Sequence, residues 1–277
     1  MAQIGFIGFG SMGSMLVKGL IQYGQIEQNQ IIITRKNKDK LKEIKDRWPE
    51  ALIAQDATEV VMNSEMIFLC VKPYDNKLIL DEIKSVIQPE QHIITITGSL
   101  MLQDIKKILT CKISKLMPTV ISEVMEGVAL ICHNDKVTDA NAKELEKLLE
   151  SFTKIKRLPE KDFDFASEIT SCGPGFFASI FSEFVNAGAR YTTSFTKEEL
   201  AYLSLQTITG TIRLMEVNHM NFSDVIARVA TKGGITEEGV IVLQEGLPEV
   251  FDHMYQRTLS KRAVVNEKMH DQFCVEP

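Results

Sequence analysis

The chain has 277 residues, of which 44% are hydrophobic and 25% are charged, and its formal net charge is −6. This composition is typical of a folded protein of one large or two modest domains, and it argues against a disordered or collagen-like chain and against nucleic acid as a partner. The five cysteines have no paired or metal-ligand spacing, and no apolar stretch is long enough to span a membrane, so we expect a cytoplasmic protein without a metal centre.

Short β-rich segments alternate with helical patterns over the first 158 residues. Strands are predicted at residues 3–7, 31–34, 51–54, 66–71, 92–97, 112–117 and 127–133. Helices are predicted between the first two strands, ending at Gly24, and at residues 38–47, 75–87, 102–109 and 139–152. This alternation predicts an α/β fold with a Rossmann-type, doubly wound parallel sheet that is covered by helices on both faces.

Only helical segments follow residue 158. They are predicted at residues 163–191, with an interruption at Gly173-Pro174-Gly175, and at 197–218, 222–230, 237–245 and 248–269. We therefore expect residues 159–277 to form an all-helical second domain. Its first helix has a wide apolar stripe made of Phe165, Ile169, Phe176, Ile180, Phe181 and Phe184. Such a stripe packs either within the subunit or against a second copy, and the pattern alone leaves both open.

A glycine-rich motif, Gly8-Phe9-Gly10-Ser11-Met12-Gly13, lies between the first predicted strand and the first helix. In a GxGxxG motif in this context, the first glycine permits the tight turn and the second lets the backbone approach a pyrophosphate. The third lets helix and strand pack closely, while the helix N-terminus attracts the phosphates. Because the motif opens a repeated βα pattern, we predict that residues 1–158 form a dinucleotide-binding domain.

The end of the second strand indicates which dinucleotide is bound. An NAD site would have an acidic residue there, about 20 residues after the motif, to hold the ribose 2′-hydroxyl. This chain instead has Thr34-Arg35-Lys36. A guanidinium at the end of this strand suits a 2′-phosphate, so Arg35 and Lys36 favour NADP. The lysines that follow, Lys40, Lys42 and Lys45, are interpreted as the solvated face of the next helix.

Other polar residues lie at strand ends. The fourth strand ends in Val71-Lys72-Pro73, and in a doubly wound sheet this end borders the cofactor crevice. Lys72 is either an ordinary strand-end lysine or a cation beside the nicotinamide ribose. His92 and His133 flank apolar strands and are interpreted as structural. No Ser/His/Asp or Cys/His arrangement indicates nucleophilic catalysis.

Together these segments resemble the pyrroline-5-carboxylate reductase family over nearly the whole chain. The resemblance rests on IGFIGFGSMG, FLCVKP, KLMP followed by EGVAL, TSCGPGFFASIF, Gln206-Thr207 in LSLQTITG, and KGGITEEG. It implies an N-terminal dinucleotide domain, a helical domain that interleaves with a partner subunit in at least a homodimer, and NADPH-dependent reduction of the cyclic imine 1-pyrroline-5-carboxylate to proline.

The resemblance also implies a substrate site in the second half, with Thr236 as the catalytic and substrate-binding threonine and with Thr231, Gly233 and Gly234 beside it. If the loop opens a helix at Glu237, its backbone amides suit the substrate carboxylate. The alternative reading is a plain helix junction, with Thr236 as the N-cap residue.

Departures from the family pattern fall mainly in this half. Met-Pro-Asn-Thr-Pro is replaced by Met117-Pro118-Thr119-Val120-Ile121, Ser-Gly-Ser-Gly-Pro by Thr170-Ser171-Cys172-Gly173-Pro174, and Ser-Pro-Gly-Gly by Thr231-Lys232-Gly233-Gly234. SCGP together with KGGITEEG is similar to a divergent branch, the late competence protein ComER of Gram-positive bacteria.

Two other functions compete with the reductase. One is a non-catalytic, NADP-binding, ComER-like regulatory protein whose substrate pocket has drifted. The other is a β-hydroxyacid dehydrogenase, which uses a lysine on the first interdomain helix as the acid; this chain has no lysine between Lys161 and Lys197. The dehydrogenase is therefore the weakest of the three.

Overall fold

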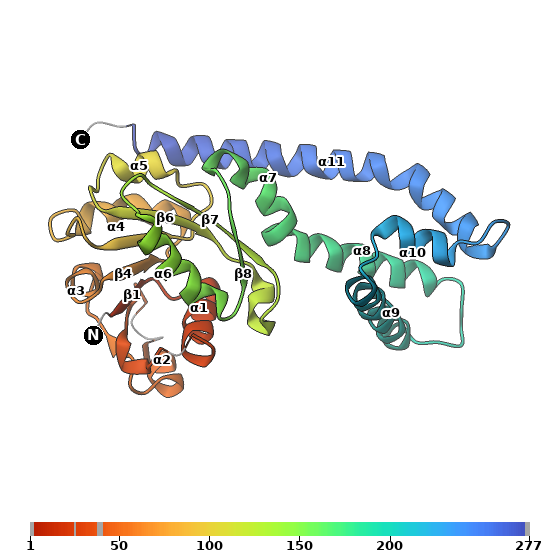
Figure 1. Ribbon diagram of the computed structural model, residues 1–277, viewed down its shortest axis with the longest axis horizontal. Coiled ribbons are helices and arrows are strands. Elements are labelled where there is room, and N and C mark those ends of the chain that lie inside the picture. The colour runs from red at the N-terminus through yellow and green to blue at the C-terminus, as the bar shows by residue number, and fades with distance from the viewer. Residues whose placement is uncertain (1–2, 25, 38–40, 275–277) are drawn as a thin grey trace. The chain divides into compact units, whose positions relative to one another are not determined.

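The computed structural model describes residues 3–24, 26–37 and 41–274. It contains an eight-stranded sheet with the order β3-β2-β1-β4-β5-β6-β7-β8. Figure 1 labels five of these strands, β1, β4, β6, β7 and β8. The strands are β1 Ile4–Ile7, β2 Ile31–Thr34, β3 Leu52–Ile53, β4 Met66–Leu69, β5 His92–Thr95, β6 Lys112–Met117, β7 Val128–His133 and β8 Lys154–Arg157. This order, in which β1 lies between β2 and β4, confirms the predicted doubly wound fold.

Helices cover both faces of the sheet. One face packs against α1 Ser11–Gln22, α2 Leu41–Arg47 and α6 Asp139–Glu150. The other packs against α3 Ala57–Met62, α4 Asn76–Ile83, α5 Leu102–Lys106, α7 Phe163–Ser167 and the C-terminal end of α11. Residues 38–40, the first part of the helix predicted at 38–47, lie outside the described residues.

Two features of the sheet differ from the prediction. Strand β7 pairs antiparallel with β6, so the sheet is not parallel throughout. Strand β8 was not predicted, because three of its four residues are basic and only Ile155 is apolar. An edge strand tolerates this composition since its outer side is unpaired, and charges there discourage pairing with another sheet.

The helical half begins with a change of helix type. Helix α7 continues into a π-helical turn, Glu168–Cys172, and α8 Gly173–Gly188 follows directly. The predicted interruption at Gly173–Gly175 is therefore wrong, because these residues form the first turn of α8. Proline is accepted in a first turn, where its missing N–H would have no helical partner.

Helix α9 Lys197–Asn218 agrees with its prediction, and α10 is Phe222–Val229. The two helices predicted at 237–245 and 248–269 are one helix, α11 Ile235–Asp271, with Pro248 inside it. The prediction of two helices was wrong because Pro248 removes only one backbone hydrogen bond. The helical pattern on both sides of the proline is continuous. None of the described helices is long and apolar enough to cross a membrane.

The chain forms two compact units. The first contains the described residues up to Gly173 together with those from Leu259 onward, and the second is Pro174–Thr258. Phe163, Met269 and Phe273 belong to the core of the first unit, which explains why it extends past the end of β8 at Arg157. The division of function at residue 158 stays a prediction.

Candidate functional site

The glycine motif forms the turn between β1 and α1. Gly8 has a φ of +91°, and a Cβ there would lie 2.6 Å from the carbonyl oxygen of Cys70, so only glycine fits. A Cβ on Gly13 would lie 3.1 Å from Gly8 O and 3.1 Å from Cys70 Cβ, which reflects close packing of α1 on the strands. A Cβ on Gly10, the residue before α1, would meet nothing within 4 Å. The backbone of Gly10 is thus open to an approaching ligand.

The remaining motif residues have different surroundings. Ser11 and Met12 are the first two residues of α1, where backbone N–H groups have no helical acceptor. Phe9 packs edge-on against Trp48, with 5.7 Å between ring centroids. Gly8 N donates to Thr34 O at 2.9 Å, so the amides that can receive an anion are those at the start of α1.

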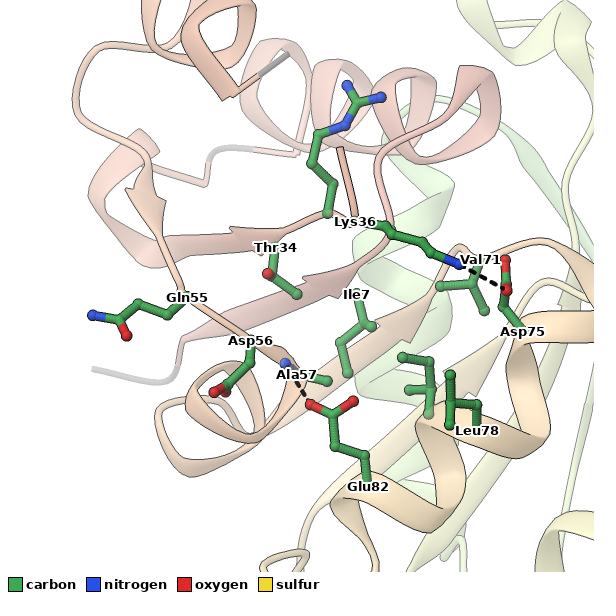
Figure 2. Close-up of a pocket in the computed structure, with 13 residues that line it drawn as sticks. Ile7, Thr34, Lys36, Gln55, Asp56, Ala57, Val71, Asp75, Leu78 and Glu82 are labelled. Carbon is green, nitrogen blue, oxygen red and sulfur yellow. Dashed lines mark hydrogen bonds and ion pairs between the residues drawn. The ribbon is translucent and has the colours of Figure 1, made fainter. Parts of the chain in front are cut away.

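A pocket of about 250 Å³ lies beside this turn, at the carboxyl ends of β1 and β2 (Figure 2). Its lining comprises Ile7, Gly8, Thr34, Arg35, Lys36, Gln55, Asp56, Ala57, Val71, Asp75, Leu78, Ile79 and Glu82. The structure therefore brings Gly8, Thr34, Arg35, Lys36 and Val71 from the predicted cofactor residues to one cavity.

The two cations of this pocket differ in their partners. Lys36 Nζ lies 3.8 Å from Asp75 Oδ1, an exposed ion pair that Figure 2 shows across the pocket. Arg35 has no hydrogen bond or ion pair within the described part of the chain. A half-buried guanidinium without a partner suits a phosphate group, which it can bind through two parallel hydrogen bonds.

The pocket also contains three carboxylates, but each has a structural partner. Asp56 caps α3 by accepting a hydrogen bond from Glu59 N at 2.8 Å, and Glu82 Oε1 accepts one from Ala57 N at 3.2 Å (Figure 2). Asp75 is the partner of Lys36. The described residues directly after β2, Arg35-Lys36-Asn37, include no carboxylate to hold an unphosphorylated ribose. The residues present therefore fit a dinucleotide with a 2′-phosphate.

The segment after β4 is held by a residue that the sequence analysis missed. Asn76 is fully buried, and its Nδ2 donates to Pro73 O at 2.9 Å and to Thr97 Oγ1 at 3.0 Å. It thereby ties the Val71-Lys72-Pro73 segment to the residues after β5. Val71 lines the pocket, whereas Lys72 and Pro73 are exposed beside it.

His92 and His133 lie at the opposite edge of the sheet, at the start of β5 and at the end of the antiparallel β7. Ser114 Oγ lies 2.6 Å from His92 Nε2 and 2.6 Å from His133 Nδ1, and His133 Nε2 lies 3.2 Å from Glu146 Oε1. Burial lowers the pKa of His92 to about 3, so this imidazole is neutral. Their positions agree with the structural interpretation.

Three of the predicted substrate residues, Thr231, Gly233 and Gly234, form a loop before α11. Gly234 N donates to Thr231 O at 2.9 Å, and Gly233 has a φ of +73°, so the turn closes directly before Ile235. Helix α11 therefore begins two residues earlier than Glu237. Thr236 is inside its first turn, and the alternative in which Thr236 is the N-cap residue is wrong.

The Gly233 amide of this loop has a partner as well. Gly233 N donates to Glu237 Oε2 at 2.6 Å, and Glu237 stands in the first turn of α11. The loop thus binds a carboxylate of its own chain at an amide that the sequence analysis assigned to the substrate. The loop belongs to the second compact unit and the nucleotide pocket to the first. Within the described residues, no cluster of His, Cys, Asp or Glu could hold a metal ion.

Two family models match separate parts of the chain. Residues 3–99 match the family model described as NADP oxidoreductase, coenzyme F420-dependent, which agrees with the predicted NADP-dependent oxidoreductase. Residues 160–264 match the model described as pyrroline-5-carboxylate reductase dimerisation. The nucleotide pocket and the Gly233–Gly234 loop fall in separate matches.

Among individual proteins, the chain is 31% identical over 274 residues to pyrroline-5-carboxylate reductase 3 of Bacillus subtilis, covering 98% of this chain and 100% of the relative. It is 25% identical to ComE operon protein 4 of the same organism, covering 94% of each chain, in agreement with the predicted competence branch. The structures of pyrroline-5-carboxylate reductase from Coxiella burnetii and of the NADP-bound Plasmodium falciparum enzyme match with TM-scores of 0.83 and 0.81. Each is 23% identical and covers 97% of this chain and 98% of the neighbour, which shows a shared fold. This chain therefore belongs to the pyrroline-5-carboxylate reductase family.

Proposed function

We propose that this protein reduces the C=N bond of a cyclic imino acid, 1-pyrroline-5-carboxylate or a close analogue, to the corresponding amine, with NADPH as the donor. The central observation is that Arg35, which has no partner among the described residues, lines a pocket that also borders the glycine turn. The chain's place in the reductase family gives this pocket its meaning. NADPH, when bound, supplies the hydride. With 1-pyrroline-5-carboxylate as substrate, the product is proline.

The reaction needs little acid-base chemistry from the protein. A protonated cyclic imine is already a strong electrophile, so catalysis consists chiefly of positioning the carbon next to the donor and excluding water. This explains why the crevice at the carboxyl ends of the strands functions without a histidine, since His92 and His133 lie at the other edge.

The chain's own residues have separate roles in this proposal. The amides at the start of α1 bind the pyrophosphate, and Arg35 with Lys36 binds the 2′-phosphate. The Thr236 hydroxyl donates to the substrate, while the amides of Gly233 and Gly234 donate to its carboxylate. For this, Glu237 must leave the Gly233 amide, a small cost because the contact is exposed, and the Gly234 amide must turn from Thr231 O towards the substrate.

We further propose that two copies associate through the second unit. Every one of residues 174–258, all of which the structure describes, is exposed or half-buried. The exposed apolar side chains there include Phe177, Phe184, Tyr202, Leu205, Val242 and Val250. Helices with so much uncovered apolar surface need a partner, and the match to a dimerisation domain supports a second copy.

The competing proposal is a regulator that binds NADP without turnover. The Glu237 carboxylate on the Gly233 amide favours it, because an internal carboxylate competes with a carboxylate substrate. The similarity to ComE operon protein 4 is compatible with either function.

Absorbance at 340 nm distinguishes the two proposals. Purified protein is mixed with NADPH and 1-pyrroline-5-carboxylate, with NADH in a parallel assay. The reductase oxidises NADPH faster than NADH, and Thr236→Ala lowers kcat/KM by about ten- to a thousandfold without changing NADPH affinity. Tight NADPH binding without oxidation supports the regulator. Equal turnover by Thr236→Ala would place the substrate contact elsewhere.

Glu237→Gln provides a second measurement on the same loop. Because the neutral amide competes less well with a carboxylate, KM for the imino acid falls by about two- to tenfold, the scale of one exposed hydrogen bond. Glu238→Gln is the matched control, since Glu238 also stands in the first turn of α11 and no hydrogen bond joins its side chain to the described residues of the loop.

A further inference from the structure

A second cluster of polar side chains lies at the same edge of the sheet as the glycine turn, next to the residues that follow β5 and β6. Ser171 Oγ, from the π turn Glu168–Cys172, donates to Pro118 O, just after β6, at 3.1 Å. The guanidinium of Arg262 approaches Gly98, just after β5, and its Nη1 is 3.9 Å from where a Gly98 Cβ would stand. All these residues belong to the first compact unit.

Arg262 is held by a buried carboxylate. Its Nε donates to Glu168 Oε1 at 3.0 Å, its Nη2 donates to the same oxygen, and Nη2 also lies 3.7 Å from Cys172 Sγ. The Glu168 side chain is 1% exposed and that of Arg262 is 18% exposed. Both bonds go to one carboxylate oxygen, so the pair holds the guanidinium plane in one orientation.

The Arg262–Glu168 pair contains atoms that can still form hydrogen bonds. None of the hydrogen bonds of Arg262 to described residues involves Nη1. Glu168 Oε2 is buried without a partner, and so is the hydroxyl of Thr119, the residue after Pro118. Buried polar groups normally have partners, and unpaired ones grouped at one edge of a sheet point to a bound group. π turns are also frequent at functional sites.

The direction of a bound dinucleotide indicates which part reaches this group. The pyrophosphate sits at the glycine turn, and the pocket at the end of β2 takes the adenosine half with its 2′-phosphate. The other half then runs in the opposite direction, over β4 towards β5, because a dinucleotide spans the crevice where the strand order reverses. The nicotinamide end therefore meets Gly98 and Arg262.

We propose that Arg262 binds the nicotinamide carboxamide, with Nη1 donating to the carboxamide oxygen, and that Glu168 is the positioning residue that holds the guanidinium. The paired carboxylate also neutralises the arginine. An unpaired cation would oppose the positive charge that the ring acquires as it loses hydride. This role rests on the cofactor named in the proposed function, and it does not depend on the substrate.

The affinities of two ligands distinguish nicotinamide binding by Arg262 from a purely structural role of this residue. NADPH contains the nicotinamide, whereas 2′,5′-ADP has only the adenosine half. Both are titrated by calorimetry into the full-length protein and into the variants Arg262→Met, Arg262→Lys and Glu168→Gln, with Lys261→Met as the matched control from the same turn of α11.

We expect Arg262→Met to weaken NADPH by about tenfold, the scale of one hydrogen bond, and to leave 2′,5′-ADP unchanged. Glu168→Gln should weaken NADPH less, and Lys261→Met should weaken neither ligand. The fluorescence of the bound dihydronicotinamide ring should change in Arg262→Met, which a structural role alone would not produce.

Unchanged NADPH affinity and fluorescence in Arg262→Met would overturn the proposal, and so would equal losses for both ligands. If Arg262→Met does not fold, Arg262→Lys, which keeps the charge but not the fork of donors, should still lower NADPH affinity relative to 2′,5′-ADP; equal losses would reject the role. A wild type that binds neither ligand would instead reject the cofactor in the proposed function, and this inference with it.

Discussion

The two compact units differ in where their apolar side chains lie. In the sheet unit, both faces of the sheet have a buried cluster, with Phe68 in one and Leu69 in the other. In the helical unit, no residue between 174 and 258 is buried, although the structure describes all of them. Burial of apolar surface is the main favourable term in folding. The sheet unit therefore has a core of its own, and the helical unit needs a second chain to acquire one.

This difference extends to the two candidate sites. The nucleotide pocket lies in the unit with a core, so its geometry is present in a single chain. The Gly233–Gly234 loop lies in the unit without one, so in the proposed dimer its position depends on association. Cofactor binding and substrate binding should consequently respond to different mutations, and the following predictions test that separation.

The largest effect should come from charging the exposed apolar face of α8. Phe177 and Phe184 are 56% and 68% exposed. The double variant Phe177→Glu/Phe184→Glu should weaken self-association by more than about a thousandfold, since each buried Phe contributes about 1.5–3 kcal/mol and each charge would be desolvated. Sedimentation velocity at micromolar concentration measures this. Met62→Glu on α3, at a side chain 70% exposed in the sheet unit, is the control. A wild type that sediments as a monomer would contradict the prediction.

The next effect should appear at the glycine turn. Gly10→Val should weaken NADPH and NADH alike, by at least about a hundredfold or ~2.7 kcal/mol, because its side chain would occupy the space through which the pyrophosphate approaches. The melting temperature should stay unchanged, since a Cβ there touches nothing. Gly13→Val is the contrasting variant: its Cβ would be crowded by Cys70 and Gly8, so it should lower the melting temperature. Calorimetric titration and thermal denaturation measure the two effects.

Arg35→Ala should have a smaller and more selective effect. We expect a loss of about 1.5–3 kcal/mol in NADPH binding, the range for a hydrogen bond to a charged group, with NADH affinity nearly unchanged. Lys42→Ala, on the exposed side of α2, is the matched control. The same loss for both cofactors would show that Arg35 does not recognise the 2′-phosphate.

The smallest effect, when expressed per pH unit, concerns the pH dependence of stability and should be confined to the sheet unit. His92 is 3% exposed, and its pKa falls from 6.5 to about 3 on burial. Between these values the unfolded chain binds a proton that the folded chain does not. Stability should therefore fall by up to ~1.4 kcal/mol per pH unit as the pH drops from about 6.5 towards 3. Urea unfolding at several pH values measures the slope, which His92→Gln should reduce. An identical slope in the variant would exclude His92 as its source.

Local sequence patterns predicted a large part of the first unit. The glycine motif, the β-rich segments and the basic residues after β2 were identified because each reflects a short-range requirement: a turn, a buried strand, a charge at a strand end. Strand β8 was missed because its stability comes from pairing with β7 rather than from its own composition. Two helices were predicted in place of α11 because Pro248 is a local helix-breaking residue. A proline by itself does not show how strongly the turns on either side favour one continuous helix.

The sequence by itself determined the fold class, the position of the dinucleotide turn and the preference for a phosphorylated ribose. Each of these depends on residues that are neighbours along the chain or follow successive strands. Only the tertiary structure decided that Glu237 binds the Gly233 amide and that Asp75 pairs with Lys36. It also decided that Arg262 meets Glu168, although 94 positions separate them. No local pattern indicates such a contact, because it arises when the end of α11 packs against the sheet unit.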